Sequence, residues 1–450
     1  MSFVSVAFLL FLPIVFALYW ALHSRVRWQN VLLLAASYVF YGWWDPRFLI
    51  LILVTSASSF AGGILLERCR HRRTVLVANI LLNLGILGTF KYYNFFMDNL
   101  RLLLPSLDAP TLNIILPVGI SFYTFQSLGY CIDVYRRSIR PTHDVVAFFA
   151  YIAFFPQLVA GPIERATQLL PQMLAPRIFR YDEATDGLRR MLWGFFKKMV
   201  IADNCAVAVN LIWADYAHAD ALTLLMGLLL FTFQIYGDFS GYSDIAIGTA
   251  RLFGIRLMEN FRLPYFSPSM PEFWRRWHVS LMTWFRDYLY IPLGGSREGT
   301  LRLVRNTLIV FFLSGLWHGA NWTFVVWGVY NACLLLLWRV VPLRSVLLTF
   351  LLTAIGWGIF RSADMAEAVG YLSRLFSTMV TAHFGIIAHG KQALLWCLLL
   401  VAVEWRQRHR EHPLQLTGTP TVARWVVYYA LFFIVFFARG EEQAFIYFQF

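Results

Sequence analysis

Repeated apolar runs constrain the fold of this chain more than any other feature. Several are shorter than the roughly 20 residues that a straight transmembrane helix needs. Short runs interrupted by Gly and Pro are typical of re-entrant or broken helices that line a protein cavity, where irregular backbone is tolerated. The pattern predicts an all-α integral membrane protein, with about 11–12 transmembrane helices plus re-entrant and interfacial helices. The runs lie near residues 4–22, 30–43, 48–66, 74–90, 113–132, 144–160, 191–213, 221–236, 306–318, 322–338, 345–360, 391–404 and 425–438.

The composition supports a membrane protein rather than a soluble one. Of 450 residues, 59% are hydrophobic and 14% are charged, whereas soluble domains are about half apolar and about a quarter charged. The first run, 4–22, lacks the basic start and small-residue cleavage site of a removed signal peptide, so we expect it to remain as a span. Internal repeats and low-complexity segments are not evident, and residues 1–450 are expected to form a single membrane domain.

The positive charges predict the orientation of the chain. The net charge is +13, and the basic residues gather in short loops between apolar runs. This is the positive-inside pattern and does not indicate nucleic-acid binding. Placing the basic loops 67–73, 135–140, 164–190 and 406–410 in the cytoplasm puts both termini outside. The run 144–160 lies between two of these loops, so it cannot be a simple crossing and is predicted to be re-entrant.

Metal and cofactor signals are missing from the sequence. The five cysteines are scattered without metal-ligand spacing or a disulfide pattern. Dinucleotide fingerprints, phosphate-binding loops, nucleophile elbows and zinc-protease motifs are not found either. We therefore expect no metal site and no bound cofactor.

One histidine, His318, stands out as a candidate catalytic residue. His318 lies in the apolar stretch Phe311–Leu337, where an imidazole loses hydration at a cost in free energy unless a partner or polar cavity compensates. Ionisable groups at membrane depth are functional candidates by default. His278 lies 40 residues upstream in a basic, aromatic segment. The alternative for His318 is a structural hydrogen bond that holds helices together.

The segment around His278 has a second candidate role. Phe273–Tyr290 is predicted to form one amphipathic helix with aromatic faces suited to the headgroup region. Arg275, Arg276 and Trp277 would then lie at a basic entrance for an anionic cytoplasmic donor, such as a thioester that carries phosphates. The alternative is an interfacial helix that binds anionic lipid.

Two carboxylates follow the apolar run 221–236. Asp238 and Asp244 are costly so close to a span unless they are solvated or paired. Gly237 and Gly241 would allow a close helix approach or a local break. The alternative is a helix that ends at the interface, with Asp238 as its cap.

Six stretches together resemble the membrane-bound O-acyltransferase superfamily. The resemblance is closest to its bacterial branch, which contains the alginate O-acetylase, the peptidoglycan O-acetyltransferase membrane subunit and the teichoic acid D-alanyl transfer protein. It extends from about residue 90 to the C-terminus. It implies a ring of transmembrane helices around a central funnel, with His318 as the catalytic histidine and His278 as the second. The stretches are LPVGISFYTFQSLGYCIDVYR, FFPQLVAGPIER, QIYGDFSGYSDIAIG, LPYFSPSMPEFWRRWHVSLMTWFRDYLYIPLGGSR, FFLSGLWHGANWTFVVWG and the final FIYFQF.

The resemblance also implies a reaction. An acetyl group would move from a cytoplasmic thioester, acetyl-CoA or an acyl carrier protein, across the bacterial inner membrane to an extracytoplasmic polysaccharide such as alginate or peptidoglycan. Besides the lipid bilayer, the expected partner is an extracytoplasmic SGNH-type or similar acetyltransferase that passes the group to the polymer. The runner-up is D-alanyl transfer to teichoic acid from a carrier protein.

A proton-coupled transporter or flippase is the alternative from another class. His318, Asp238 and Asp244 would then form a proton relay. Transporters commonly show two related halves, and such a repeat is not seen in this sequence.

Two further residues are candidates for supporting roles. Asn321, three residues after His318, could orient the imidazole or hold the thioester carbonyl oxygen. Tyr447, in the C-terminal tail, could receive the acyl group and pass it to an extracytoplasmic partner. The alternative for the tail is that its aromatic residues anchor the last span at the interface.

Overall fold

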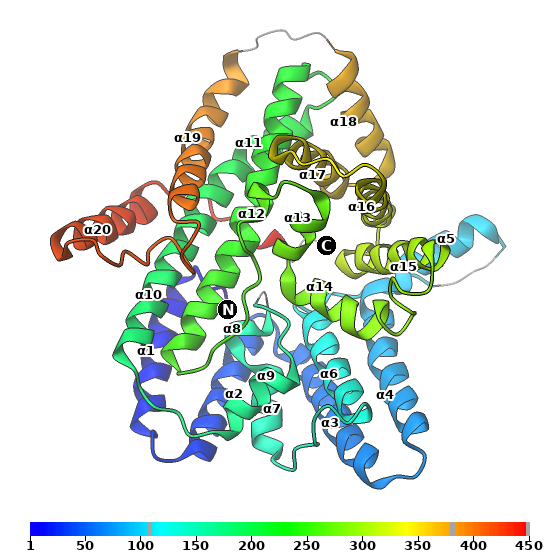
Figure 1. The fold of residues 1–450 in the computed structure, drawn as a ribbon, viewed down its shortest axis with the longest axis vertical. Coiled ribbons are helices and arrows are strands. Elements are labelled where there is room, and N and C mark those ends of the chain that lie inside the picture. The colour runs from blue at the N-terminus through cyan, green and yellow to red at the C-terminus, as the bar shows by residue number, and fades with distance from the viewer. Residues whose placement is uncertain (107–109, 160, 379–383, 447–450) are drawn as a thin grey trace. The chain divides into compact units, whose positions relative to one another are not determined.

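A computed structural model describes residues 1–106, 110–159, 161–378 and 384–446, with the backbone alone for residues 384–389. Within these residues all regular structure is helical (Figure 1), which confirms the predicted all-α fold. The chain divides into two compact units, Met1–Gly187 with Ala246–Met258, and Leu188–Ile245 with Glu259–Phe450. The expectation of one membrane domain over residues 1–450 stays a prediction, and each unit is described by itself.

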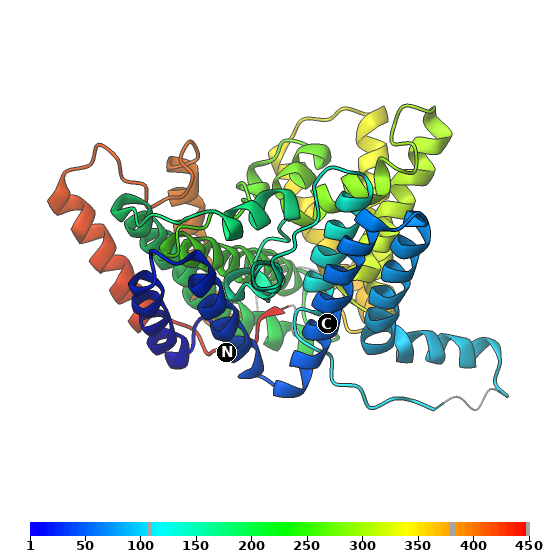
Figure 2. The ribbon, with the colours of Figure 1, turned by 90° about the horizontal axis from the view of Figure 1, so that it is seen from below.

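The first unit contains the N-terminal helices. Its first two helices, α1 (Val6–Ala21) and α2 (Val26–Gly42), lie side by side in both views (Figures 1 and 2). The first helix begins after Ser5, whose hydroxyl accepts a hydrogen bond from the backbone N–H of Phe8 at 3.2 Å, the usual cap of a helix start. The elements are α1 (Val6–Ala21), α2 (Val26–Gly42), η1 (Pro46–Phe48), α3 (Leu49–Arg68), α4 (Arg72–Leu87), η2 (Gly88–Tyr92), α5 (Tyr93–Leu103), α6 (Ile120–Tyr135), α7 (Val145–Ala153), α8 (Phe155–Leu158) and α9 (Ala166–Leu174).

The second unit carries both candidate histidines. Two helices, α10 (Tyr181–Phe195) and α12 (Ala221–Leu252), contain residues of both units. The other elements are η3 (Phe196–Ala202), α11 (Asp203–Ala214), η4 (Pro264–Phe266), α13 (Met270–Arg276), α14 (Val279–Phe285), η5 (Arg286–Tyr290), α15 (Thr300–His318), α16 (Trp322–Val340), α17 (Val346–Arg361), α18 (Met365–Ser377), α19 (Phe384–Arg406) and α20 (Thr421–Phe437).

Four of the described helical segments are long and apolar enough to cross a membrane. They are Pro46–Arg68, Arg72–Leu103, Ala221–Leu252 and Trp322–Val340. Four shorter apolar helices, at Val6–Ala21, Val145–Leu158, Val346–Arg361 and Thr421–Phe437, account for further predicted runs. The larger number of spans, the funnel and the positions of the two termini stay predictions.

The run 144–160 is short and broken. Helix α7 ends at Ala153 after nine residues, and α8 follows it with four. Phe154, between them, leaves the helical region with φ −51° and ψ 107°. A helix of nine residues is far below the roughly 20 that span a bilayer. Its length therefore agrees with the predicted re-entrant course.

The predicted single helix over Phe273–Tyr290 is wrong. The chain forms α13, turns at Trp277 and His278, and then starts again as α14. His278 adopts φ 45° and ψ 51°, in the left-handed region that side chains with a Cβ rarely occupy. The break is stabilised by Asn260, whose backbone carbonyl accepts a hydrogen bond from Val279 N at 3.0 Å.

Helix α12 continues through its acidic residues. The predicted alternatives of a break at the glycines, or of an end capped by Asp238, are wrong, because the helix runs on to Leu252. The expected close approach is confirmed instead. A Cβ on Gly241 would lie 2.8 Å from the carbonyl oxygen of Gly194 on α10, too close for any other residue. Asp238 and Asp244 are therefore held inside a helix and must find partners on its neighbours.

Helices α15 and α16 also pack at a glycine contact. A Cβ on Gly315 would collide with the carbonyl oxygen of Phe324, and one on Gly328 would collide with that of Phe311. Small residues let two helix backbones approach closely. This contact fixes the last turn of α15, which ends at His318.

Candidate active site

His318 is the last residue of α15 and is buried among aromatic rings of the second unit. Its ring centroid lies 5.0 Å from the ring of Trp327, 5.1 Å from that of Trp317 and 5.3 Å from that of Phe360. The interplanar angles lie between 77° and 89°, so the rings meet edge to face. Such surroundings exclude water from the imidazole and hold its plane in one orientation.

His278 lies beside His318. The two ring centroids are 6.5 Å apart. His278 is 1% exposed and packs edge to face on Phe239 of α12 at 4.7 Å, and Trp317 lies 5.7 Å away. The structure thus brings the two predicted histidines together in one buried, aromatic environment. Their catalytic roles stay predictions.

Asn260 organises the backbone and side chain around His278. It is fully buried, and its Oδ1 accepts hydrogen bonds from Ser280 N at 3.2 Å and from Ser280 Oγ at 2.9 Å. The same oxygen lies 3.1 Å from Nδ1 of His278. Its Nδ2 donates to Ser243 Oγ on α12 at 3.4 Å. One asparagine therefore joins α12, the start of α14 and a candidate catalytic imidazole.

The His278 imidazole is neutral at ordinary pH. The residue lies between two helices of seven residues each, outside the four candidate spans. Burial lowers the pKa of His278 to about 3, because a charged imidazole would lose its hydration there. A neutral imidazole carries one N–H donor and one nitrogen lone pair, so it can accept a proton from a substrate.

The three predicted donor-binding residues have different surroundings. Arg275 is exposed. Arg276 forms an ion pair with Glu272, one turn earlier on α13. Trp277 is buried, with its ring 4.8 Å from Trp357 and 5.6 Å from Phe273, so it belongs to the aromatic wall beside His278. Of the three side chains, that of Arg275 is the most open to an anionic ligand.

Asn321 serves as a helix cap. Its Oδ1 accepts a hydrogen bond from Thr323 N at 3.1 Å, and its Nδ2 donates to the carbonyl of Ala363 at 2.6 Å. The side chain thus begins α16 and ties it to the segment that follows α17. Its predicted contact with the imidazole or the substrate stays untested.

Asp238 anchors the C-terminal segment. It forms an ion pair with Lys198 at 2.9 Å and accepts a hydrogen bond from the backbone N–H of Ile446 at 2.7 Å. Lys198 also pairs with Asp203 at 2.8 Å and donates to the carbonyl of Gln443 at 2.9 Å.

The aromatic residue next to this anchor reaches towards the site. Phe445 packs on Tyr242 at 4.3 Å and lies 5.9 Å from Phe239, the ring that contacts His278. The tail therefore returns to the wall of the site at Phe445. Tyr447 lies outside the described residues.

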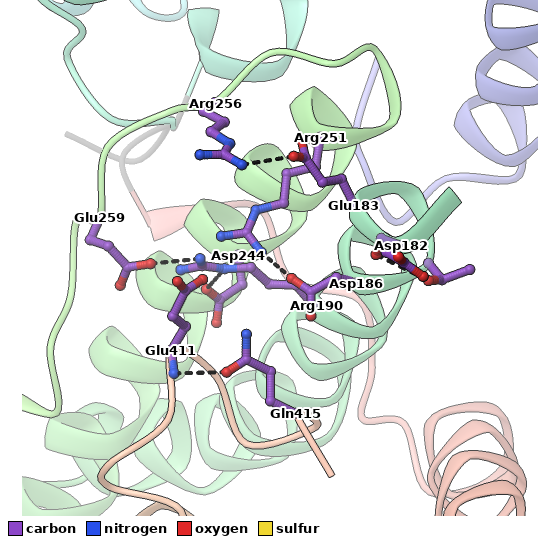
Figure 3. A network of polar contacts seen from close by, with 11 residues as sticks. Asp182, Glu183, Asp186, Arg190, Asp244, Arg251, Arg256, Glu259, Glu411 and Gln415 are labelled. Atoms are coloured by element: carbon purple, nitrogen blue, oxygen red, sulfur yellow. Dashed lines mark hydrogen bonds and ion pairs between the residues drawn. The ribbon is translucent and has the colours of Figure 1, made fainter. Parts of the chain in front are cut away.

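Asp244 is neutralised by two cations, as Figure 3 shows for one of them. Arg190 pairs with Asp244 at 2.8 Å and with Glu259 at 2.6 Å. Lys197 pairs with the second oxygen of Asp244 at 2.6 Å. Two cations and two carboxylates balance, which satisfies the requirement that buried charges be paired. The figure also shows the Arg256–Glu183 pair of the first unit, at 2.7 Å.

Sequence reasoning missed Asn260 and Lys198. Both are polar and buried, but neither stands in a motif with its partner, since Asn260 precedes His278 by 18 residues. The only signal was indirect, because a buried aspartate such as Asp238 demands a cation somewhere. Among the described residues, no group of three or more metal-ligating side chains is found.

One family model and several known proteins match this chain in sequence. The sequence model of the membrane-bound O-acyltransferase family matches residues 135–361. A probable alginate O-acetylase of Pseudomonas aeruginosa is 42% identical over 397 residues, covering 84% of this chain and 75% of the relative. A peptidoglycan O-acetyltransferase of Helicobacter pylori is 32% identical over 411 residues, covering 80% and 77%. A teichoic acid D-alanyltransferase of Bacillus subtilis is 28% identical over 245 residues, covering 51% and 61%.

The matched residues contain the buried site. His278, His318, Asn260 and Asp238 all lie within the segment 135–361. The C-terminal tail that contacts Asp238 lies beyond it.

Proposed function

Since this chain belongs to the membrane-bound O-acyltransferase family, we propose that it moves an acetyl group from a cytoplasmic thioester across the bacterial inner membrane for O-acetylation of an extracytoplasmic polysaccharide. Family membership establishes an O-acyltransferase and sets the transporter alternative aside. The acetyl group and the polysaccharide come from the names of the two relatives that cover most of the chain. The observation that carries the proposal is the buried His278–His318 pair, with ring centroids 6.5 Å apart.

The proposed chemistry is attack of a hydroxyl on the thioester carbonyl. A nitrogen of His318 accepts the proton of the acceptor hydroxyl while the new C–O bond forms. The carbon–sulfur bond then breaks, and the leaving thiolate takes the proton from the imidazolium. General-base assistance of this kind contributes about 10²–10⁴ in rate. Donor and acceptor that meet in one confined site also avoid much of the entropic cost of encounter.

The donor is proposed to be acetyl-CoA or an acyl carrier protein thioester. Both carry phosphate on the cytoplasmic side. The exposed guanidinium of Arg275 is suited to that charge, because guanidinium groups form two parallel hydrogen bonds to phosphate. D-alanine on a carrier protein is the competing donor, and the relative with that activity covers 51% of this chain.

Delivery to the polymer is proposed to involve a second protein. An extracytoplasmic SGNH-type or similar acetyltransferase would take the acetyl group from this chain. Tyr447 is the proposed carrier, because its hydroxyl can form an ester and the residues just before it are held against Asp238. Replacing Tyr447 with Phe removes only the hydroxyl. Full acetylation of the polymer by Tyr447→Phe would exclude the covalent role.

The experiment that tests the proposed function uses purified protein in nanodiscs with radiolabelled acetyl-CoA. Wild type, His318→Ala and His278→Ala are compared for thioester hydrolysis and for transfer of label to the protein or to an added partner. We expect turnover by wild type and a loss of about 10²-fold or more in His318→Ala. His218→Ala is the control, because His218 is exposed and pairs with Asp215 on the surface.

Comparing different thioester donors in this assay distinguishes the proposed carriers and acyl groups. Turnover of acetyl-CoA supports coenzyme A as the carrier, and turnover only with a charged carrier protein supports the other donor. If D-alanyl carrier protein is consumed and both acetyl donors are left intact, the acetyl assignment is wrong. Undiminished turnover in both histidine variants would contradict the catalytic pair.

A further inference from the structure

The side-chain atom of Asn260 that contacts His278 is its oxygen, Oδ1, and not its nitrogen. An asparagine side chain can be placed with its oxygen and nitrogen exchanged, but here the neighbouring donor decides between them. Ser280 N is a backbone amide, which can only donate, and it lies 3.2 Å from Oδ1 of Asn260. The atom that faces it must therefore be the carbonyl oxygen.

That oxygen determines which nitrogen of His278 carries the proton. Nδ1 of His278 lies 3.1 Å from the same Oδ1 and 3.4 Å from Ser280 Oγ, whose own proton is donated to Oδ1 at 2.9 Å. Two acceptors cannot hydrogen-bond each other, so Nδ1 must be the donor. A neutral imidazole has one proton, and with that proton on Nδ1 the other nitrogen, Nε2, keeps its lone pair. Among the described residues, Nε2 has no hydrogen-bond partner.

We propose that Asn260 is a positioning residue that fixes the tautomer of His278, with the proton on Nδ1 and a free lone pair on Nε2. Its importance for catalysis rests on the proposed function, in which His278 forms a buried pair with His318. The consequence is specific. His278 can accept a proton or a hydrogen bond at Nε2, and it cannot donate one to a developing oxyanion from that atom.

The backbone of the site supports this role. His278 has φ 45°, a conformation that costs free energy for a residue with a Cβ and persists only where the surroundings enforce it. Asn260 holds the backbone that follows His278, because its carbonyl accepts a hydrogen bond from Val279 N and its side-chain oxygen accepts one from Ser280 N. Asn260 thus orients the imidazole of His278 and determines which of its two nitrogens carries the proton.

The test determines which ring nitrogen of His278 carries the proton. The full chain is labelled with ¹⁵N-histidine, placed in nanodiscs, and the ring nitrogens of His278 are assigned by their loss in His278→Gln. We expect a protonated Nδ1 and a bare Nε2 in wild type. Asn260→Asp should keep this pattern, because a carboxylate oxygen accepts the same hydrogen bonds. Asn260→Ala should produce a mixture of tautomers and lower kcat for acetyl transfer by about 10²-fold, with KM nearly unchanged.

Ser280→Ala serves as the matched control. It removes the hydroxyl that binds Oδ1 of Asn260 and lies 3.4 Å from Nδ1 of His278, and it leaves the Ser280 N–H in place, so it separates the hydroxyl from the carbonyl oxygen. The Nδ1-protonated pattern should remain. A wild-type His278 with its proton on Nε2 would overturn the proposal, and so would Asn260→Ala with the tautomer unchanged.

A loss of folding, or a lack of any catalytic role for His278, can be distinguished from a wrong tautomer assignment. If Asn260→Ala does not fold, the wild-type and Asn260→Asp spectra still decide the matter. If His278→Ala retains full acetyl transfer while wild type shows the expected tautomer, the catalytic role of His278 is wrong and the positioning by Asn260 stands.

Discussion

At the scale of single residues, the cost of burying imidazoles indicates where the candidate site lies. His318 and His278 are both almost fully buried among aromatic rings, and their ring centroids lie 6.5 Å apart. An isolated histidine in a core can be structural, but two such groups side by side concentrate proton-accepting capacity in one place. The pair is therefore the proposed proton acceptor for acyl transfer.

The burial of His278 has a measurable effect on stability. Burial lowers the pKa of His278 to about 3 in the folded protein, whereas an unfolded histidine titrates near about 6.5. Between these values the unfolded state binds the extra proton, so stability is present above about pH 6.5 and is lost as the pH falls. We expect wild type to lose more thermal stability than His278→Gln when the pH drops from about 7.5 to about 5. Equal losses in melting temperature would mean that His278 protonates in the folded state.

The sequence identified the two histidines but not the residues that hold them. His318 was found because an apolar stretch of sequence shows the desolvation of its imidazole directly. Asn260 could not be found in that way. Its partner His278 follows 18 residues later, and only the break between α13 and α14 brings the amide to the imidazole. Asn321 was selected for its nearness to His318 in sequence, and the structure adds that its side chain caps α16, while its role at the site stays a prediction.

At the scale of helices, close backbone contacts position the site. The α15–α16 contact at Gly315 and Gly328 leaves no room for a Cβ, and His318 lies one turn beyond Gly315. Helix periodicity alone did not reveal these contacts. It did locate the helices themselves, since apolar runs such as 322–338 match α16.

A substitution at the glycine contact should disturb both stability and activity. We expect Gly328→Ala to destabilise the protein by about 1–3 kcal/mol, because overpacking forces the two helices apart. Activity should fall as His318 moves. Gly85→Ala on α4 is the control, since nothing lies within 4 Å of the added Cβ. Thermal unfolding and acetyl transfer are measured for both variants, and an unaffected Gly328→Ala would contradict the close packing.

The C-terminal segment should depend on one buried lysine. Lys198 pairs with Asp203 and Asp238 and binds the carbonyl of Gln443. Replacing it with Met leaves two buried carboxylates without a cation, at a cost of about 3–5 kcal/mol. We expect faster release of C-terminal residues by carboxypeptidase in Lys198→Met.

The exposed Lys391 of α19 supplies the comparison. Lys391→Met should be digested at the wild-type rate. If Lys198→Met is also digested at that rate, the ion-pair cluster does not hold the tail.

At the scale of the whole molecule, charge and hydropathy indicate an all-α membrane protein. The apolar runs predicted the all-α fold, and the motifs predicted the family. The arrangement in the membrane was harder to predict, because only four described segments meet the length and hydropathy of a span. Short and broken helices such as α7, α13 and α14 are stabilised by contacts with other segments, and those contacts leave no periodic signal in the sequence.

The proposed passage of acetyl groups across the membrane through this chain can be measured in a sided assay. Proteoliposomes contain the protein in one orientation, with radiolabelled acetyl-CoA supplied only at the cytoplasmic face and polysaccharide acceptor with its transferase enclosed on the other. We expect labelled polymer inside the vesicles with wild type, and a loss of about 10²-fold or more with His318→Ala. Label that reaches only acceptors on the donor side, or equal labelling by His318→Ala, would contradict it.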